Sequence, residues 1–198
     1  MSQRLARLIS NLLNPFLVSL IVIILLSFQA TSSAAEAIRW SLISLACSVL
    51  PVFAVVVYLV RQHKLEGIFV NPRRQRNQIF WLAIACAVLG CFVLSYWGAP
   101  GLLLATFVAG LAAIVAFTGV NLLWKISLHT AFVAASVTIL VIVYGAMGAL
   151  TAVLLPPVAW ARIKLGLHSP AQVTGGALLA AVIVFIVFRF FRLTGAHI

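Results

Sequence analysis

Residues 79–119 read IFWLAIACAVLGCFVLSYW-GAP-GLLLATFVAGLAAIVAFTG, two long apolar runs separated by Gly98-Ala99-Pro100. Neither run contains a charged side chain, and each is close to the roughly 20 apolar residues that a helix needs to cross a bilayer. Gly and Pro are typical of tight turns, so the two runs are predicted to form a transmembrane helical hairpin. Their continuous apolar character does not fit the in/out alternation of a membrane β-barrel strand.

Apolar segments of similar length lie on both sides of this hairpin. Segment 130–160 has 31 residues, which would span about 46 Å as one helix, more than the bilayer core. It contains Gly145-Ala146-Met147-Gly148, where we expect it to break into two short helices. The remaining apolar segments are residues 15–30, 40–60 and 171–188. The sequence therefore predicts an all-α protein, a polytopic transmembrane helical bundle of about six to seven spanning helices. Residues 1–198 are expected to form a single membrane-embedded domain.

The composition agrees with a membrane protein and narrows its chemistry. Hydrophobic residues make up 65% of the 198 residues and charged residues 8%, whereas a soluble domain carries about 25% charged residues. The mean hydropathy is +1.23. Lys and Arg number 13, against two acids, Glu36 and Glu66, and no Asp. Because proteins hold Mg²⁺ mainly through carboxylates, this composition disfavours membrane enzymes that use Asp-rich metal motifs.

The basic residues are distributed unevenly between the two sides of the predicted bundle. Alternate crossings place segments 61–78, 120–129 and 161–170 on the side of the N-terminus. Ten of the 13 Lys and Arg residues fall on that side: Arg4, Arg7, Arg61, Lys64, Arg73, Arg74, Arg76, Lys125, Arg162 and Lys164. Three of the four histidines join them: His63, His129 and His168. The positive-inside rule explains much of the Lys and Arg bias and predicts a cytoplasmic face. It does not explain the histidines, which favour a face that binds an anion at the membrane surface.

The third of these segments contains the most informative pattern. Residues 160–176 read WARIKLGLHSPAQVTGG, so five residues separate Arg162 from His168, and Gln172 follows His168 by four positions. This pattern resembles the third signature of the type 2 phosphatidic acid phosphatase superfamily, S-R-x5-H-x3-D. Ala161 stands in place of the Ser and Gln172 in place of the Asp. The H-x3-Q variant is similar to the dolichyl-diphosphate phosphatase branch.

Two earlier segments resemble the other signatures of the same superfamily. Residues 125–129, KISLH, are similar to its P-S-G-H signature and keep Ser127 and His129. The first signature is K-x6-R-P, and Lys64 with Asn71-Pro72 has this spacing, with Asn in place of Arg. Three further bases follow at once and would supply the missing charge: Arg73, Arg74 and Arg76.

This resemblance implies a metal-independent phosphomonoester or diphosphate hydrolase that needs no cofactor. His168 would attack phosphorus and form a phosphohistidine, and His129 would protonate the leaving oxygen. Gln172 would accept a hydrogen bond from His168 through its amide oxygen. The remaining candidates would hold the phosphate of a lipid substrate: Arg162, Ser127, Lys125, Lys64, Arg73, Arg74 and Arg76. The Gln variant favours an isoprenoid diphosphate or monophosphate, and phospholipid monophosphates stay open.

Several of these residues also have a structural interpretation. Residues 169–172, SPAQ, form a capping box with Pro at the first helical position, so Gln172 would cap a helix whether or not it orients His168. Lys64 and Arg61 are also typical of snorkelling anchors. The three later arginines are also typical of topology charges or of contacts with anionic lipids: Arg73, Arg74 and Arg76.

Other functions were weighed against phosphatase activity. Departures at Ala161, Leu128, Asn71 and Gln172 favour a catalytically degraded family member that binds or moves phospholipid. A small transporter or channel is disfavoured because no Asp or Glu lies within a predicted span. Nucleic-acid binding is disfavoured because the bases lie in short turns between spans. We therefore expect an integral protein of the cell membrane whose partners are a lipid phosphate and membrane lipids.

Overall fold

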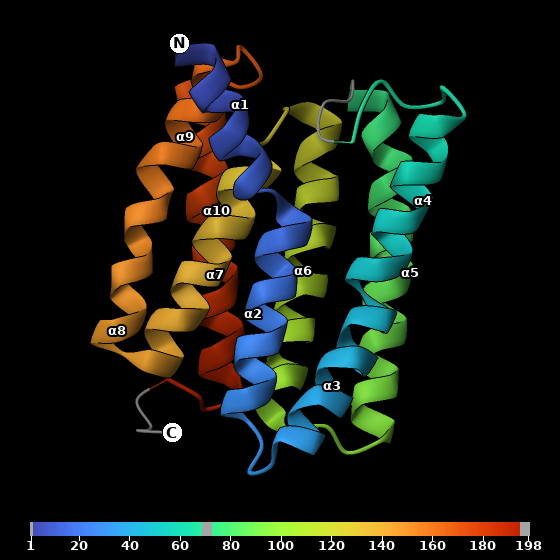
Figure 1. Cartoon of the computed structure of the whole chain (residues 1–198), viewed down its shortest axis with the longest axis vertical. Helices are drawn as coiled ribbons and strands as arrows, with labels where there is room; N and C mark the ends of the chain where they lie inside the picture. Colours follow the sequence, from blue (N-terminus) through green and yellow to red (C-terminus); the bar gives the residue numbers. More distant parts are fainter. Residues whose placement is uncertain (1, 69–72, 195–198) are drawn as a thin grey trace. The chain divides into compact units, whose positions relative to one another are not determined.

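The computed structural model describes residues 2–68 and 73–194, and in this part of the chain every regular element is a helix (Figure 1). The predicted all-α class is confirmed. The helices are α1 (Ser2–Leu12), α2 (Pro15–Gln29), α3 (Ala34–Cys47), α4 (Val49–Arg61), α5 (Arg73–Tyr96), α6 (Gly101–Leu123), α7 (Leu128–Tyr144), α8 (Ala146–Ala149), the 3₁₀ helix η1 (Leu150–Leu154), α9 (Leu155–Lys164) and α10 (Pro170–Phe190).

Most of these helices are long and apolar enough to cross a membrane. Within the described residues, five stretches meet that requirement: Ala34–Arg61, Asn77–Tyr96, Gly101–Leu123, Ala146–Lys164 and Pro170–Phe190. The pair α1 and α2, bent by 42°, makes a sixth if it is counted as one span. Helix α7 is apolar but shorter, at 17 residues. The chain is therefore a polytopic helical membrane protein, and the elements coincide with the predicted segments.

The N-terminal helix α1 is an element that the apolar segments did not predict. It is amphipathic, with Ala6 and Ser10 buried and its leucines exposed. Asn14 accepts a hydrogen bond from the Leu17 N–H at 3.0 Å and so caps the next helix. Pro15, which lacks an N–H, begins α2. The chain therefore bends between α1 and α2 instead of continuing as one straight helix.

The long apolar segment 130–160 breaks where its glycines predict. Gly145 has φ of 58°, a conformation that favours glycine, and it separates α7 from α8. Gly148 lies so close to the Leu140 carbonyl that a Cβ would overlap it. From Ala146 the chain runs back through α8, η1 and α9 beside α7, so one apolar segment makes two passes (Figure 1).

The chain divides into two compact units. Unit 1 comprises residues 1–19 and 123–198, and unit 2 comprises residues 20–122. In unit 1, α10 packs against α7, and α9 contacts both α1 and α7. The core of unit 1 is formed by Val133, Val137 and Val158, against which Leu13 and Val18 pack. The prediction of a single domain stays a prediction.

In unit 2, α5 packs against α3 and α6 through small and polar residues. A Cβ added to Gly90 of α5 would overlap the Phe107 ring of α6 and lie 3.4 Å from the Cys47 Cβ of α3. Asn121 of α6 donates a hydrogen bond to Asn77 of α5 at 2.9 Å. These contacts hold the predicted hairpin of α5 and α6 together inside an apolar environment.

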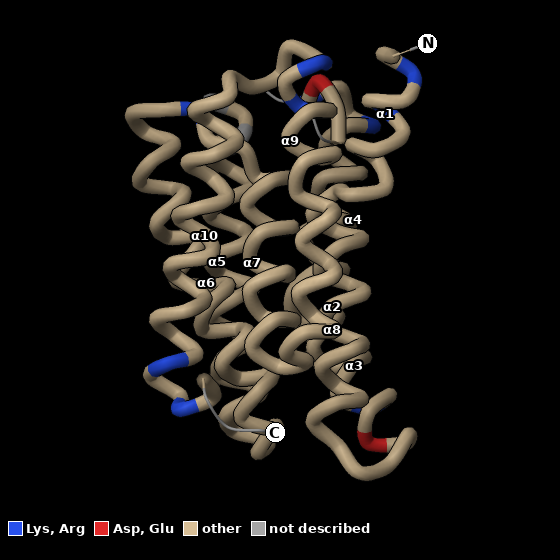
Figure 2. Tube along the Cα trace, turned by 90° about the vertical axis from the view of Figure 1, so that its left-hand side faces the viewer, with Lys and Arg blue, Asp and Glu red and all other residues tan. Residues whose placement is uncertain are grey.

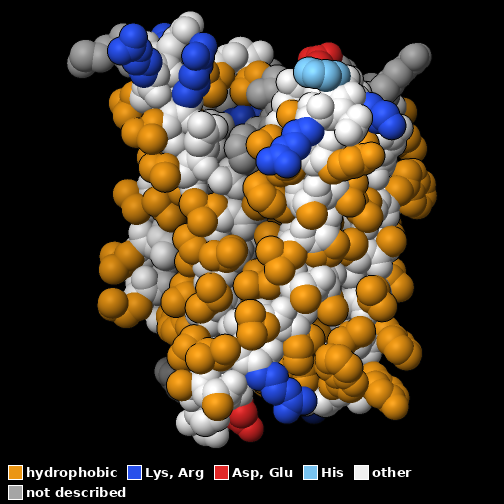
Figure 3. Space-filling view, turned by 45° about the vertical axis from the view of Figure 1, so that its right-hand side comes forward, with side chains coloured by type: hydrophobic (Ala, Val, Ile, Leu, Met, Phe, Trp, Pro, Cys, Tyr) orange, Lys and Arg blue, Asp and Glu red, His pale blue; other side chains and the backbone are white. Residues whose placement is uncertain are grey.

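The surface of each unit has the polarity expected of membrane helices. Lys and Arg lie toward the helix ends in Figure 2, and in Figure 3 the middle of the visible helices is covered by hydrophobic side chains. Large apolar residues such as Trp81, Phe92 and Phe185 are more than half exposed. Such wide apolar exposure fits contact with lipid tails and would be a liability in water.

Candidate active site

The turn between α9 and α10 explains the spacing of Arg162 and His168. Arg162 lies in the last turn of α9, and its carbonyl accepts hydrogen bonds from the N–H groups of Leu167 at 3.1 Å and His168 at 3.3 Å. Gly166 makes this reversal with φ of 67°, a left-handed conformation that glycine adopts without strain. Ser169 then begins α10 as its N-cap. One short turn thus ties the His168 backbone to the Arg162 backbone.

His168 is oriented by Gln172, one helical turn further on. The His168 Nδ1 and the Gln172 Oε1 are 3.1 Å apart. The same Oε1 accepts the Ser169 N–H at 3.2 Å, and the Gln172 N–H donates to the Ser169 Oγ at 3.3 Å. The predicted capping box is therefore present, and the predicted hydrogen bond to His168 is present as well. Gln172 thus caps α10 and hydrogen-bonds His168 at the same time.

The capping box also determines which nitrogen of His168 carries its proton. A backbone N–H can only donate, so the Gln172 atom facing Ser169 is the carbonyl oxygen and not the amide nitrogen. That oxygen accepts, so the facing Nδ1 of a neutral His168 carries the hydrogen. The other ring nitrogen, Nε2, then keeps its lone pair, which is what a nucleophilic imidazole requires.

The second predicted motif lies against the third. The Ser127 N–H donates to the backbone carbonyl of Gln172 at 3.3 Å, and the Thr130 hydroxyl donates to the backbone carbonyl of Val173 at 3.0 Å. A Cβ at Gly176 would lie 2.7 Å from the Ser127 carbonyl, so only glycine permits this approach of α10 to the start of α7. The structure therefore brings residues 127–130 and 168–176 together at one end of unit 1.

The polar residues of these two motifs differ in burial. Ser127 and His129 are buried, whereas Lys125, His168 and Gln172 are half-buried. The Ser127 Oγ has no hydrogen-bond partner among the described residues. A buried hydroxyl left in this way retains capacity to bind a ligand oxygen. The half-buried His168 remains accessible to a molecule arriving from the helix ends.

Arg162 is the most buried cation of the described chain, with 3% of its surface exposed. Its Nη1 donates a hydrogen bond of 2.8 Å to the Ser10 hydroxyl of α1. The sequence of unit 1 contains no Asp or Glu, since Glu36 and Glu66 both belong to unit 2. No Asp or Glu of unit 1 therefore neutralises this guanidinium.

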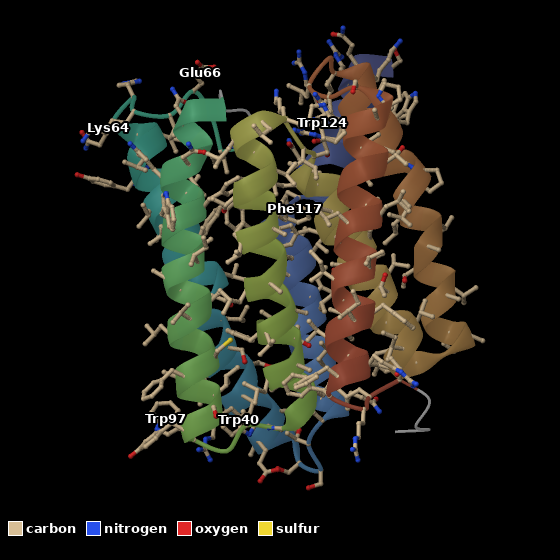
Figure 4. The ribbon with its side chains drawn as sticks, turned by 180° about the vertical axis from the view of Figure 1, so that it is seen from behind. Trp40, Lys64, Glu66, Trp97, Phe117 and Trp124 are labelled. Atoms are coloured by element: carbon tan, nitrogen blue, oxygen red, sulfur yellow. The ribbon has the colours of Figure 1, made fainter. Side chains whose placement is uncertain are left out.

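Two neighbours of the site were missed by the sequence interpretation. Ser10 has no motif around it. The one weak signal is its spacing of four residues from Ala6, which places both on the buried face of α1. Trp124, labelled in Figure 4, has its ring 3.0 Å from where a Cβ of Gly175 would stand. Its position just before Lys125, together with its amphipathic ring, suits the interface beside a membrane site.

The residues of the first motif belong to unit 2. Lys64 is exposed beyond the end of α4, and it is labelled in Figure 4 near Glu66. Asn71 and Pro72 lie outside the described residues. The arginines after them begin α5, but their side chains lie outside the described part: Arg73, Arg74 and Arg76. Their contribution to phosphate binding stays a prediction.

No family model matches this chain, and the comparisons with curated proteins and with solved structures found no match. Within the described residues, no three His, Cys, Asp or Glu side chains form a group that could hold a metal ion. The chemistry of the site therefore has to be argued from its own geometry.

Proposed function

We propose that this protein is an integral membrane lipid-phosphate phosphatase that works through a phosphohistidine on His168. The observation that carries this proposal is the Gln172 amide oxygen bridging the His168 Nδ1 and the Ser169 N–H. This bridge holds the neutral imidazole as the tautomer with its hydrogen on Nδ1 and its lone pair on Nε2. The likeness of residues 125–129 and 160–176 to phosphatase signatures supports the same chemistry.

The residues around His168 suit a two-step displacement at phosphorus. The His168 Nε2 attacks phosphorus, the bond from phosphorus to the oxygen of the leaving group breaks, and His129 gives that oxygen a proton. Water then attacks the phosphohistidine and gives a proton back to His129, the bond from phosphorus to Nε2 breaks, and inorganic phosphate and the original His168 result. Arg162, Lys125 and Ser127 are the unit 1 residues that would hold the phosphate oxygens while negative charge develops on them.

The neutral Gln172 favours substrates with a good leaving group. An Asp at this place would stabilise the positive imidazole that forms during attack, whereas an amide only orients the ring. When the terminal phosphate of an isoprenoid diphosphate is attacked, the leaving group is a phosphate monoester, which is far more stable than an alkoxide. An isoprenoid diphosphate is therefore the preferred substrate, with phospholipid monophosphates as the slower class.

One observation favours a second candidate, a non-catalytic protein that binds or moves phospholipid. Gln172 and Ser169 form a complete capping box, so Gln172 has a role in the fold that requires no chemistry. In that case Arg162 would still bind a phosphate, but His168 would not turn it over.

Phosphate release in detergent distinguishes these candidates. We expect the purified protein with EDTA present to release phosphate from an isoprenoid diphosphate and, more slowly, from phosphatidic acid. His168→Ala should lower kcat at least about 1,000-fold while phosphate still binds. The matched control is His63→Asn, because His63 is exposed in unit 2 and its φ of 54° is one that Asn tolerates. No release from any lipid phosphate, or a rate abolished by EDTA and restored by Mg²⁺, would contradict the proposal.

A further inference from the structure

The hydrogen bond between Ser10 and Arg162 joins the two separate chain segments that make up unit 1. Ser10 lies on α1 and Arg162 on α9, 152 positions apart, and each is 3% exposed. The 2.8 Å distance from Nη1 to Oγ lies within the usual range of an N–H···O hydrogen bond. Helices α1 and α9 also pack against each other (Figure 1). Ser10 is thus a fixed neighbour of Arg162.

The chemistry of Ser10 suits the positioning of a cation that must bind an anion. A carboxylate in this place would hold the guanidinium and would also cancel its charge. A hydroxyl accepts one N–H and leaves the full positive charge for a phosphate. A guanidinium has five N–H donors, and the bond to Ser10 uses one of them.

The structure around Ser10 keeps its hydroxyl in place. Asn14 donates from its side chain to the Asn11 carbonyl at 2.6 Å, which ties down the last turn of α1. Leu13 and Val18 pack against the core valines of α7 and α9. Ser10 therefore cannot follow Arg162 freely, and the long, flexible arginine side chain is the partner that becomes ordered.

We propose that Ser10 is a positioning residue that holds the Arg162 guanidinium in the orientation that binds the substrate phosphate. The inference rests on the proposed function for its effect on turnover, and on phosphate binding by Arg162 for its effect on affinity. Without the hydroxyl, Arg162 keeps its charge but loses the hydrogen bond that fixes it to α1, so ligand binding has to supply more of its ordering and weakens more than the chemical step.

The test compares three variants in detergent by steady-state kinetics and by calorimetric titration with inorganic phosphate. Ser10→Ala is expected to raise KM and the phosphate Kd about 10-fold, since a hydrogen bond to a charged group is lost, with kcat changed less than about twofold. Ser10→Thr, which keeps the hydroxyl, should restore both values. Asn11→Ala, on the exposed face of the same helix, should match wild type.

A double-mutant cycle separates positioning from a general loss of stability. In an Arg162→Lys background, Ser10→Ala should have little further effect on the phosphate Kd, because the hydrogen bond it removes is already altered. Additive losses would assign Ser10 a purely structural role and overturn the inference, as would a Ser10→Ala variant with wild-type KM and Kd. A variant with normal kinetics but a lowered Tm would overturn it in the same way.

The same measurements distinguish this inference from the proposed function. If wild type binds phosphate but releases none from lipids, while Ser10→Ala weakens that binding, the phosphatase proposal fails and the positioning role stands. If wild type hydrolyses lipid phosphate and Ser10→Ala has unchanged KM and phosphate Kd, the phosphatase proposal stands and the positioning role fails. A wild-type protein that neither binds phosphate nor hydrolyses lipid phosphate would overturn both.

Discussion

The two units differ in whether they bury a positive charge. Unit 1 buries Arg162 against a neutral hydroxyl and contains no Asp or Glu, whereas unit 2 contains both acids and leaves Arg61 and Lys64 exposed. An exposed cation at a helix end keeps its hydration and needs no partner. A buried guanidinium loses hydration, and this cost is recovered when an anion binds. Burial, rather than the number of bases, therefore identifies the cation that is suited to a ligand.

The polar contacts between helices also differ between the two units. In unit 2, Asn121 and Asn77 pair with each other across α6 and α5. In unit 1, the Thr130 hydroxyl and the Ser127 N–H bond to carbonyls of α10, which brings two motif segments together. Polar groups of unit 2 thus support helix packing, and those of unit 1 also assemble a site.

Among the cations, the largest expected effect comes from comparing one base of each unit. Arg162→Ala should lower kcat/KM by about 100-fold or more, because a preorganised donor to the phosphoryl oxygens is lost. Lys64→Ala should lower it less than about 10-fold, since Lys64 is exposed and solvent screens its charge. Steady-state phosphate release measures both, with Arg61→Ala as the exposed control. Equal losses at Arg162 and Lys64 would break the contrast and show that the first motif contributes as much as the third.

A smaller effect is expected at Gln172. Gln172→Ala removes the acceptor for both His168 and the Ser169 N–H, and should lower kcat about 10-fold or more, since a bond to a positive imidazole contributes about 1.5–3 kcal/mol. It should also lower Tm, because a helix cap contributes about 1 kcal/mol.

Gln172→Glu sharpens this experiment. Glu keeps the capping box and adds the negative charge that an Asp would supply, so both kcat and Tm should be at least those of wild type. A Gln172→Ala protein with lowered Tm and unchanged kcat would contradict the orienting role and favour the capping role alone.

The last prediction concerns orientation in the membrane and has the smallest charge difference behind it. It also compares one residue from each unit. We propose that the active face is cytoplasmic, since Arg4 and Arg7 lie on its side of the predicted topology and Arg39 lies in the first turn on the other. An impermeant maleimide on intact cells should label Ser32→Cys and spare Ser2→Cys. Labelling of Ser2→Cys alone would reverse the orientation and move the chemistry to the outer face. The parent protein is the control for the native cysteines.

Much of the fold was predictable because membrane helices are limited by local composition. The Gly98-Ala99-Pro100 turn, the break at Gly145 and the capping box at Ser169 all follow from backbone preferences of neighbouring residues. The hydrogen bond between His168 and Gln172 was also predictable, since a capping box turns the Gln172 side chain back toward the residues at the N-cap of α10. These features depend on a few consecutive residues and on the apolar solvent around them.

The features that needed the tertiary structure join residues far apart in the chain. Composition by itself determined a polytopic helical membrane protein with a strong excess of bases, because apolar length and charge are properties of the sequence alone. Only the packing of α1 on α9 placed Ser10 against Arg162, and only the close approach of α10 to α7 required glycine at Gly176. The physical reason is that burial and long-range hydrogen bonds depend on which helix faces meet. In a chain this uniformly apolar, nearly every face could meet another, so hydropathy does not specify the pairs.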